Sequence, residues 1–346
     1  MRSLLVTGAA GFIGANFVHY WIAHHPEDAI IALDALTYAG NRESLASAMT
    51  HPRFRFVHGD IRNRALVTSL LKEAHIDTIV HFAAESHVDR SISGPGAFIE
   101  TNVVGTYELL EAARAVWLST PGIQHRFHHV STDEVYGSLR PEDPPFTEET
   151  RYDPQSPYAA SKAASDHLVR AYGNTYGLRY TISNCSNNYG PYQFPEKLIP
   201  LCILNLLKGQ PLPIYGDGQY VRDWLHVEDH CLGIDLILQR GRDGETYNIG
   251  GNCEHTNLEV IAHLCSIMDA HRPDARWCPH SSLTTFVKDR PGHDRRYAIN
   301  ASKIIRELGF KPGHSIDSRL SDTVAWYIHN ESWCESVMKR VPCHRN

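Results

Sequence analysis

Gly8-Ala9-Ala10-Gly11-Phe12-Ile13-Gly14 lies between a predicted strand at residues 4–7 and a predicted helix over Phe12–His24. The glycines of this G-x-x-G-x-x-G spacing allow a tight turn and let the backbone approach a pyrophosphate closely. The helix that follows offers free N–H groups and a partial positive charge at its first turn. The stretch therefore predicts a dinucleotide-binding turn; the alternative is a turn that only packs the helix on the strand.

Two aspartates follow the next two predicted strands, at residues 29–33 and 54–57. Asp34 stands twenty residues after Gly14, where a carboxylate can accept hydrogen bonds from both ribose hydroxyls. Its charge would repel a 2′-phosphate, so the sequence favours NAD over NADP. Asp60, after the third strand, is expected near the adenine amino group.

Short β-branched runs alternate with helical patterns through the first half of the chain. Further strands are predicted at 78–82 and 127–131, and further helices at 63–74 and 98–117. This rhythm predicts an α/β fold, a doubly wound parallel sheet of the Rossmann type with helices on both faces. Such sheets bind ligands at the carboxyl ends of their strands.

The composition of the sequence changes near residue 191, where proline and glycine become frequent and the predicted helices and strands become irregular. We expect residues 1–190 to form the NAD-binding domain with the catalytic residues. Residues 191–335 are expected to form a smaller mixed domain, some of whose elements interleave with the first, and 336–346 a tail.

The composition is that of an ordinary soluble protein. The chain has 346 residues, a net charge of −6, 42% hydrophobic and 21% charged residues. The mild acidity argues against a nucleic-acid or membrane-surface binder. No run reaches the roughly 18 apolar residues of a membrane helix, and the first residues lack the sections of a signal peptide.

Cysteine and histidine usage predicts neither disulfides nor a metal site. The 8 cysteines form no C-x-x-C pair, which indicates reduced thiols in a cytoplasmic protein. Among the 22 histidines, His226 and His230 are four apart, but the segment is not H-E-x-x-H. A helix start is favoured there, and no metal is expected.

Tyr158 and Lys162 place a phenol and an ammonium four apart on a predicted helix, hence on one face. Ser156 suits the N-cap and Pro157 the first helical position. We expect the helix N-terminus and Lys162 to lower the pKa of Tyr158 below its usual value near 10, so that it can act as a general base. The alternative is a surface pair.

Ser131-Thr132-Asp133-Glu134 ends the predicted strand 127–131. A hydroxyl followed by two carboxylates is costly to bury without a purpose, so we expect a second group of catalytic residues here. A solvated turn or a helix cap is the alternative.

With these motifs in order, the chain resembles the extended short-chain dehydrogenases/reductases over about residues 1–330, and within them the dTDP-glucose 4,6-dehydratase family. The more specific shared stretches are 83–91 (AAESHVDRS), 131–137 (STDEVYG), 184–191 (NCSNNYGP), 222–224 (RDW) and 289–297 (DRPGHDRRY).

The resemblance implies that dTDP-glucose becomes dTDP-4-keto-6-deoxyglucose plus water. Tyr158 would take the O4 proton as hydride passes from C4 to NAD, and Thr132 would bind the sugar near O4. The 4-ketone makes the C5 proton acidic, so Glu134 would remove it while Asp133 protonates the departing C6 hydroxyl. Hydride returns to C6, and Lys162 would hold the nicotinamide ribose.

The resemblance also implies binding residues. The implied NAD contacts are Gly8, Gly11, Phe12, Ile13, Gly14, Asp34, Ala35, Leu36, Thr37, Asp60, Ile61, Phe82, Ala83, Ala84, Ser86, Thr101, Tyr158, Lys162 and Asn188. The implied substrate contacts, most of them in the nucleotide-sugar-binding domain 191–335, are Ser86, Thr132, Asn187, Lys197, Leu198, Pro213, Ile214, Tyr215, Arg222, Asn257, Asp289, Arg290, Pro291, Gly292 and His293.

Some of these residues have a simpler explanation. Arg222 and Lys197 suit the negative charges of a nucleoside diphosphate, but each could be a surface residue in a salt bridge. Asn257 could instead cap a helix at 258–268.

The resemblance further implies a homodimer, with helices near 101–116 and 156–172 packing against their copies. It also implies a product that feeds deoxysugar synthesis, such as rhamnose for a surface polysaccharide.

Three other functions remain open from the sequence. They are a 4,6-dehydratase of another nucleotide hexose, a nucleotide-sugar 4-epimerase, and a non-catalytic NAD-binding scaffold. An epimerase needs Tyr158 and Lys162 but no acid–base pair at C5 and C6, so Asp133 and Glu134 favour dehydration.

Overall fold

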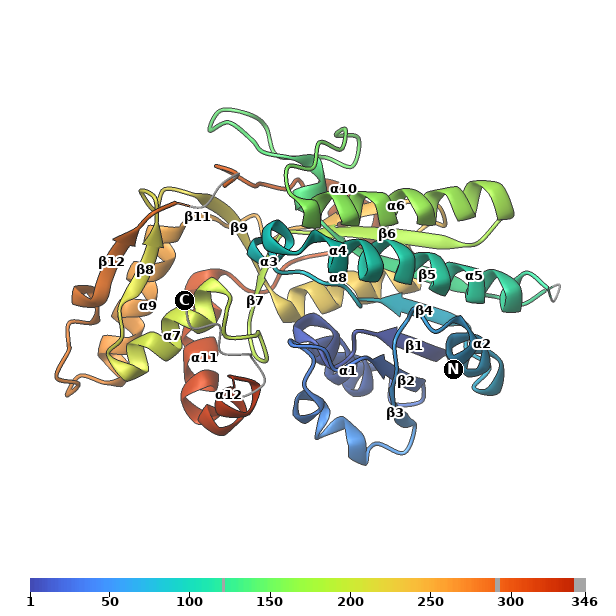
Figure 1. Cartoon of the computed structure of the whole chain (residues 1–346), viewed down its shortest axis with the longest axis horizontal. Helices are drawn as coiled ribbons and strands as arrows, with labels where there is room; N and C mark the ends of the chain where they lie inside the picture. The colour runs from blue at the N-terminus through green and yellow to red at the C-terminus, as the bar shows by residue number, and fades with distance from the viewer. Residues whose placement is uncertain (120–121, 290–292, 339–346) are drawn as a thin grey trace.

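The largest sheet has seven parallel strands in the order β10-β6-β5-β4-β1-β2-β3 (Figure 1). The computed structural model describes residues 1–119, 122–289 and 293–338. The predicted doubly wound α/β fold is confirmed. The strands are β1 (Ser3–Thr7), β2 (Ala29–Asp34), β3 (Phe54–His58), β4 (Thr78–His81), β5 (Arg126–Thr132), β6 (Tyr180–Cys185) and β10 (Thr246–Ile249).

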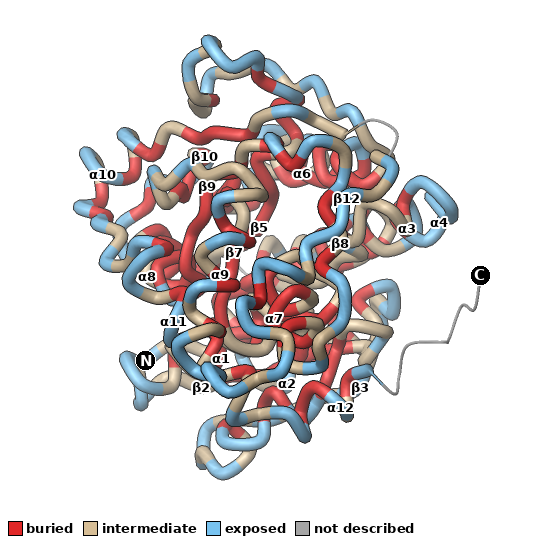
Figure 2. Tube along the Cα trace, turned by 90° about the vertical axis from the view of Figure 1, so that its left-hand side faces the viewer, coloured by how far each residue is buried: buried red, intermediate tan, exposed pale blue. Residues whose placement is uncertain are grey.

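Both faces of this sheet are buried because its strands are apolar on both sides. Leu4 and Val6 of β1 belong to one core cluster, whereas Leu5 belongs to another on the opposite face. Figure 2 shows the buried residues running through the interior and the exposed ones at outer turns. The first face is covered by α1 (Phe12–His24), α8 (Val227–Arg240) and α10 (Ser302–Leu308), the second by α2 (Arg64–Glu73), α5 (Thr106–Trp117) and α6 (Pro157–Tyr176).

The helix predicted at 98–117 is interrupted. It follows α3 (Val88–Ser93) and consists of α4 (Pro95–Phe98), a π-helical segment Ile99–Gly105 and α5. Asn102 in the π-helical segment hydrogen-bonds the backbone of Glu85 and the hydroxyl of Ser161. Hydrophobic periodicity could not show this local widening, which is common near functional sites.

A second core lies beyond the carboxyl ends of the large sheet (Figure 1). Its helices are α7 (Leu198–Lys208), α9 (Asn257–His271), α11 (Ile316–His329) and α12 (Glu331–Met338). Two small sheets flank it: β7 (Asn187–Tyr189), β9 (Val221–His226) and β11 (Glu254–Thr256) in one, and β8 (Leu212–Tyr215) with β12 (Thr284–Val287) in the other.

The chain crosses between the two parts several times. Strand β10 and helices α8 and α10 follow residue 190 in sequence, yet they complete the large sheet and its first face. The domain division at 190 therefore stays a prediction, with interleaving across it. Within the described residues, no helix is long and apolar enough to cross a membrane.

Two predicted helix starts can be compared with the structure. The start expected after His226 is confirmed, since its ring caps α8 and Glu228 and Asp229 stand in the first turn. The capping alternative for Asn257 is wrong. Thr256 is the N-cap of α9 and forms a capping box with Glu259, so Asn257 is already the first helical residue.

Candidate active site

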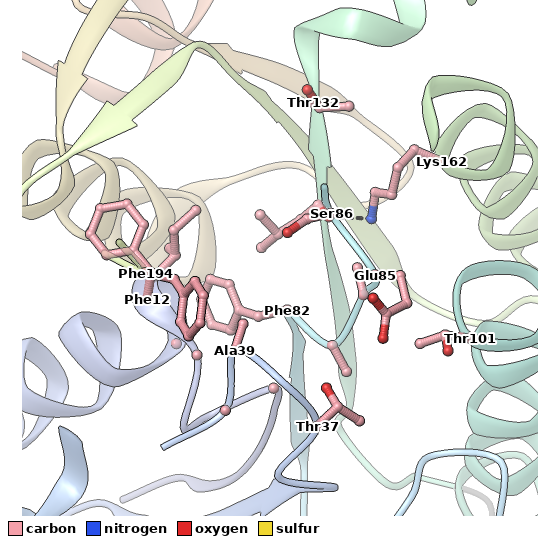
Figure 3. Close-up of a pocket in the computed structure, with 18 of the residues that line it drawn as sticks. Phe12, Thr37, Ala39, Phe82, Glu85, Ser86, Thr101, Thr132, Lys162 and Phe194 are labelled. Atoms are coloured by element: carbon pink, nitrogen blue, oxygen red, sulfur yellow. Dashed lines mark hydrogen bonds between the residues drawn. The ribbon is translucent and has the colours of Figure 1, made fainter. Parts of the chain in front are cut away.

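A cleft of about 340 Å³ opens at the carboxyl ends of β1, β2, β4 and β5. All the predicted NAD contacts line it except Leu36, whose N–H instead donates to Asp34 at 2.7 Å. Figure 3 shows Thr132 and Lys162 near one end of the cleft and Thr37 near the other. The sequence motifs, far apart along the chain, thus meet in one cavity.

The glycine turn forms the floor of the cleft with little spare room. A Cβ on Gly8, whose φ is +67°, would lie 2.6 Å from the nitrogen of Ala83. One on Gly14 would lie 2.2 Å from the carbonyl oxygen of Gly8. Gly11 is the N-cap of α1 and provides no side-chain cap, so the first N–H groups of the helix are available to an anion. These features fit a dinucleotide pyrophosphate.

Asp34 and Asp60 both line the cleft but differ in their surroundings. Asp34 is buried, and its carboxylate accepts from the backbone N–H of Ala10 at 2.8 Å and of Leu36. Asp60 is more exposed and pairs with Arg62 at 2.7 Å, and hydrogen bonds from Arg62 lower its pKa. The backbone thus holds the Asp34 carboxylate at the end of β2, where a ribose is expected.

Thr132, Asp133 and Glu134 stand at the opposite end, where β5 passes into a 3₁₀ turn, Asp133–Tyr136. All three line the cleft. Asp133 is buried, and among the described residues no group hydrogen-bonds its Oδ2 atom. Burial raises the pKa of Asp133 well above its usual value, and the charges of Glu134 and Asp223 add to this. Burial and the neighbouring carboxylates thus favour the protonated form of Asp133.

Tyr158 and Lys162 reach the same end from α6. The helix begins as predicted, with the Ser156 hydroxyl accepting from Ala159 N–H at 3.1 Å and Pro157 in first place. Lys162 Nζ donates to the carbonyl oxygen of Val130 at 2.8 Å. Both side chains are buried in the wall of the cleft.

The predicted lowering of the Tyr158 pKa is wrong for the groups of this chain. Burial raises the pKa of Tyr158 well above its usual value, and the negative charge of Glu134 adds to the shift. The hydrogen bond with Thr132 opposes it only in part. The sequence could not show that the phenol is fully desolvated beside a carboxylate.

The predicted substrate residues fall into two sets. Ser86, Thr132, Asn187 and Lys197 line the cleft, and Lys197 Nζ donates to the Ser86 carbonyl at 3.1 Å. The others do not line it; they are Leu198, Pro213, Ile214, Tyr215, Arg222, Asn257, Asp289 and His293. Arg290, Pro291 and Gly292 lie outside the described residues.

Several members of the second set lie together around Tyr220. The Tyr220 hydroxyl hydrogen-bonds Asp289, His293 stacks on the Tyr220 ring at 3.5 Å between centroids, and Asn257 N–H donates to the Tyr220 carbonyl. Arg222 is buried, lies over the Tyr297 ring at 4.5 Å and donates to the Asp294 carbonyl at 2.9 Å. It is therefore not a surface residue in a salt bridge.

Sequence reasoning missed a group of residues at the rim of the cleft. Arg90 lies over the ring of Tyr38 at 3.7 Å and donates to Glu196 at 3.3 Å. Tyr38 and Glu196 line the cleft, as does Glu85. Tyr38, Glu85 and Glu196 come from three separate loops, and no periodic pattern marks them. Glu85 and Arg90 lie in the shared stretch 83–91, but the sequence alone predicted no role for them, and Glu196 stands beside Lys197.

Two groups of possible metal ligands occur elsewhere among the described residues. They are His226, Glu228 and His314, and Asp269, Cys278 and His280. In the first, Arg319 already pairs with Glu228; in the second, Cys278 and His280 both hydrogen-bond one oxygen of Asp269. Internal contacts account for both groups, and neither borders the cleft.

Comparison with known proteins agrees with this geometry. A family model described as GDP-mannose 4,6 dehydratase matches residues 5–323. The dTDP-glucose 4,6-dehydratase of Xanthomonas campestris pv. campestris is 56% identical over 341 residues, 98% of this chain and 96% of the relative. The dTDP-glucose 4,6-dehydratase 1 of Escherichia coli strain K12 is 52% identical, covering 96% and 95%.

The chain belongs to the dTDP-glucose 4,6-dehydratase family.

Solved structures show the same relation. DesIV, a dTDP-glucose 4,6-dehydratase from Streptomyces venezuelae solved with NAD and dTDP bound, superposes with a TM-score of 0.89 at 51% identity, covering 97% of this chain and 100% of that one. A UDP-glucose 4-epimerase from Thermotoga maritima reaches 0.84 at 26% identity, covering 95% of this chain and 100% of that one. The family of dTDP-glucose 4,6-dehydratases thus shares its architecture with 4-epimerases, and the residues of the cleft must distinguish the two reactions.

Proposed function

We propose that this chain binds NAD in the cleft and converts dTDP-glucose to dTDP-4-keto-6-deoxyglucose and water, with Thr132, Asp133, Glu134, Tyr158 and Lys162 as its catalytic residues. One observation carries the proposal: Asp133 and Glu134 share a single cavity with the glycine turn, Tyr158 and Lys162. The similarity to dTDP-glucose 4,6-dehydratases over nearly the whole chain supports the substrate.

Each NAD-binding group of the chain has a defined task. The glycine turn and the start of α1 bind the pyrophosphate, Asp34 binds the adenosine ribose, and Lys162 binds the nicotinamide ribose. When bound, NAD supplies the hydride acceptor for C4, the hydride donor for C6 and, when oxidised, a positively charged ring.

Tyr158 removes the proton from O4 while Thr132 holds the sugar beside it. The chain's own groups keep the Tyr158 phenol protonated, because it is desolvated next to Glu134. Its action as a base therefore depends on the positive charge that the bound cofactor would add to the cleft.

Asp133 and Glu134 then expel water across C5 and C6. Glu134 removes the C5 proton, which the 4-ketone has made acidic. Asp133 protonates the departing O6, and Glu134 returns its proton to C5 as hydride is delivered to C6. The raised pKa of Asp133 supports its role as the acid of the pair.

The assay for this function is direct. The purified protein is incubated with dTDP-glucose, and the 4-keto product is detected by its base-induced absorbance and by mass. We expect a product 18 mass units lighter than the substrate, by loss of water. GDP-mannose, UDP-glucose and CDP-glucose serve as competing substrates. A 4-epimer at unchanged mass would instead indicate an epimerase, and no ketone with any sugar nucleotide would overturn the proposal.

The proposed enzyme is a cytoplasmic homodimer. Exposed apolar side chains on neighbouring elements support the dimer: Ile92 on α3, Ile99, Tyr107 on α5 and Tyr176 on α6. If these residues meet a second copy, Tyr107→Arg should give monomers in analytical ultracentrifugation. The product, a 4-keto-6-deoxyhexose, is the chemical precursor of 6-deoxysugars such as rhamnose, which supports a role in surface-polysaccharide synthesis.

A further inference from the structure

Helix α6 carries two more charged residues behind Tyr158 and Lys162, at the same spacing of four. Tyr158, Lys162, Asp166 and Arg170 therefore share one face of the helix, and we call this row the α6 ladder. Asp166 is completely buried. Burying an ionised carboxylate is costly unless it is paired, and no catalytic role assigned above uses it.

Two hydroxyls hydrogen-bond the Asp166 carboxylate, and the ring of His129 lies beside it. The hydroxyls of Ser131 on β5 and of Tyr152 each donate to Oδ2 at 2.8 Å. His129 Nε2, also on β5, lies 3.1 Å from Oδ1. Burial raises the pKa of Asp166, but the nearby His129 N–H, the positive charge of Lys162 and the hydrogen bond from Ser131 outweigh it and leave the pKa below its usual value. Asp166 is thus a buried anion.

The groups that face Lys162 from the sheet are neutral. Burial lowers the pKa of His129 to about 4 and that of His81 on β4 well below its usual value, so both imidazoles are uncharged at neutral pH. Burial raises the pKa of Cys185 on β6 to about 12, so its thiol keeps its proton. Asp166 is the carboxylate that acts most strongly on Lys162.

The other side of Asp166 carries further ionisable groups. Arg170 donates to the Tyr152 hydroxyl at 2.9 Å and to Thr246 at 3.2 Å, and Tyr136 lies in the adjoining 3₁₀ turn. Burial raises the pKa of Tyr136 and of Tyr152, so both phenols are neutral. The charges of the α6 ladder therefore alternate as Lys162 positive, Asp166 negative and Arg170 positive.

We propose that Asp166 is a positioning residue: its charge keeps the Lys162 ammonium protonated beside Tyr158, and its bond to Ser131 fixes the turn that presents Asp133 and Glu134. Ser131 directly precedes Thr132, and Lys162 bonds the neighbouring carbonyl of Val130. The Asp166 carboxylate thus acts both on Lys162, which serves the oxidation step, and on the turn with Asp133 and Glu134, which serve the dehydration step. The inference rests on the proposed function for the meaning of these residues, but its charge balance can be measured without substrate.

The direct test is the titration of Lys162 in the NAD-loaded protein by NMR of ¹³Cε-labelled lysine, with the signal assigned by its loss in Lys162→Met. In Asp166→Asn, an isosteric change that removes the charge, we expect the Lys162 midpoint to fall by about 1 pH unit or more. The alkaline limb of the dehydration rate should move to lower pH with it, because Lys162 then loses its proton earlier as pH rises. An unchanged midpoint in the folded variant overturns the proposal.

Two matched variants separate the effect of the Asp166 charge from that of its hydrogen bond to Ser131. Ser131→Ala keeps the Asp166 charge and removes one hydrogen bond to it, so dehydration should slow several-fold while the midpoint of the Lys162 titration stays unchanged. A full dehydration rate in this variant would show that the Ser131–Asp166 hydrogen bond does not position the turn. Arg170→Gln removes the next positive charge, so the Lys162 midpoint should rise slightly. If Asp166→Asn does not fold, Arg170→Gln decides: an upward shift supports the ladder and an unchanged midpoint contradicts it. Wild-type turnover of dTDP-glucose, measured separately, tests the proposed function.

Discussion

Two regions of the molecule bring polar residues together in different ways: the carboxyl end of the large sheet, and the second core around α7, α9 and α11. At the sheet end, neighbouring parallel strands deliver Asp34, Thr132 and the glycine turn to one cleft. In the second core, Asp289, His293 and Asn257 meet around Tyr220, apart from the wall of that cleft. The catalytic residues are thus concentrated where strands end together, and we propose that the second region binds the rest of the substrate.

Tyr158→Phe should have the largest effect. The variant keeps the ring in its buried place but cannot take the O4 proton, so kcat should fall about 10²–10⁴-fold. Loss of the first oxidation is measured as the absence of NADH absorbance on adding dTDP-glucose. Tyr172→Phe is the matched control, because Tyr172 lies on the same helix and bonds Glu111 instead of facing the cleft. Equal losses in both variants would contradict a special role for Tyr158.

Glu134→Gln should stop the reaction one step later. Hydride transfer from C4 can proceed, but the C5 proton has no base, so dehydration should slow at least 10²-fold. The measurement is single-turnover absorbance, in which NADH should form and persist. Full dehydration by this variant would show that the elimination base is another residue.

Asp133→Asn should slow dehydration and change the pH dependence of stability. The folded state raises the pKa of Asp133, so as pH rises above the unfolded value near 3.9 the unfolded chain loses this proton first and is favoured. The wild type therefore loses stability with rising pH through this group, and the variant does not. The difference in Tm, variant minus wild type, should grow from pH 4 upward; a constant difference would mean that the carboxyl is not held protonated.

Asn257→Ala should have the smallest effect and tests the second region. Thr256 caps α9, so the Asn257 side chain is not needed as a cap, and we propose that it binds the substrate. Its loss should then raise KM about five- to tenfold, the worth of one neutral hydrogen bond, with kcat and Tm unchanged. The matched variant Thr256→Ala should lower the free energy of unfolding by about 1 kcal/mol without a change in KM. A lower Tm with an unchanged KM in Asn257→Ala would show that Asn257 has a structural role instead.

The contrast between the two regions also explains what the sequence could predict. Because parallel strands deliver their last residues to one edge of a sheet, the sequence alone predicted that Asp34, Asp133 and the glycine turn lie together. It could not place Glu196 and Tyr38, which enter the cleft through loops held by Arg90. The π-helical segment could not be predicted either, since Asn102 within it makes a tertiary contact with Ser161 that local sequence does not reveal.

The sequence predicted the positions of the site residues better than it predicted their pKa values. The spacing of Tyr158 and Lys162 predicted their shared face, but not the desolvation that reverses the expected pKa shift. Burial depends on every element around a residue, whereas spacing depends only on its own helix. Asp166 illustrates the point, since its role emerges only from contacts with β5 and Tyr152.

The central claim is that one cofactor molecule carries a hydrogen from C4 to C6 while the paired carboxyl groups expel water between the two steps. The decisive measurement is conversion of dTDP-[4-²H]glucose, with the position of deuterium in the product read by mass spectrometry and NMR. The account predicts full retention, with the deuterium moved to the C6 methyl group of the same sugar. Product that lacks deuterium, or that still carries it at C4, would contradict the account.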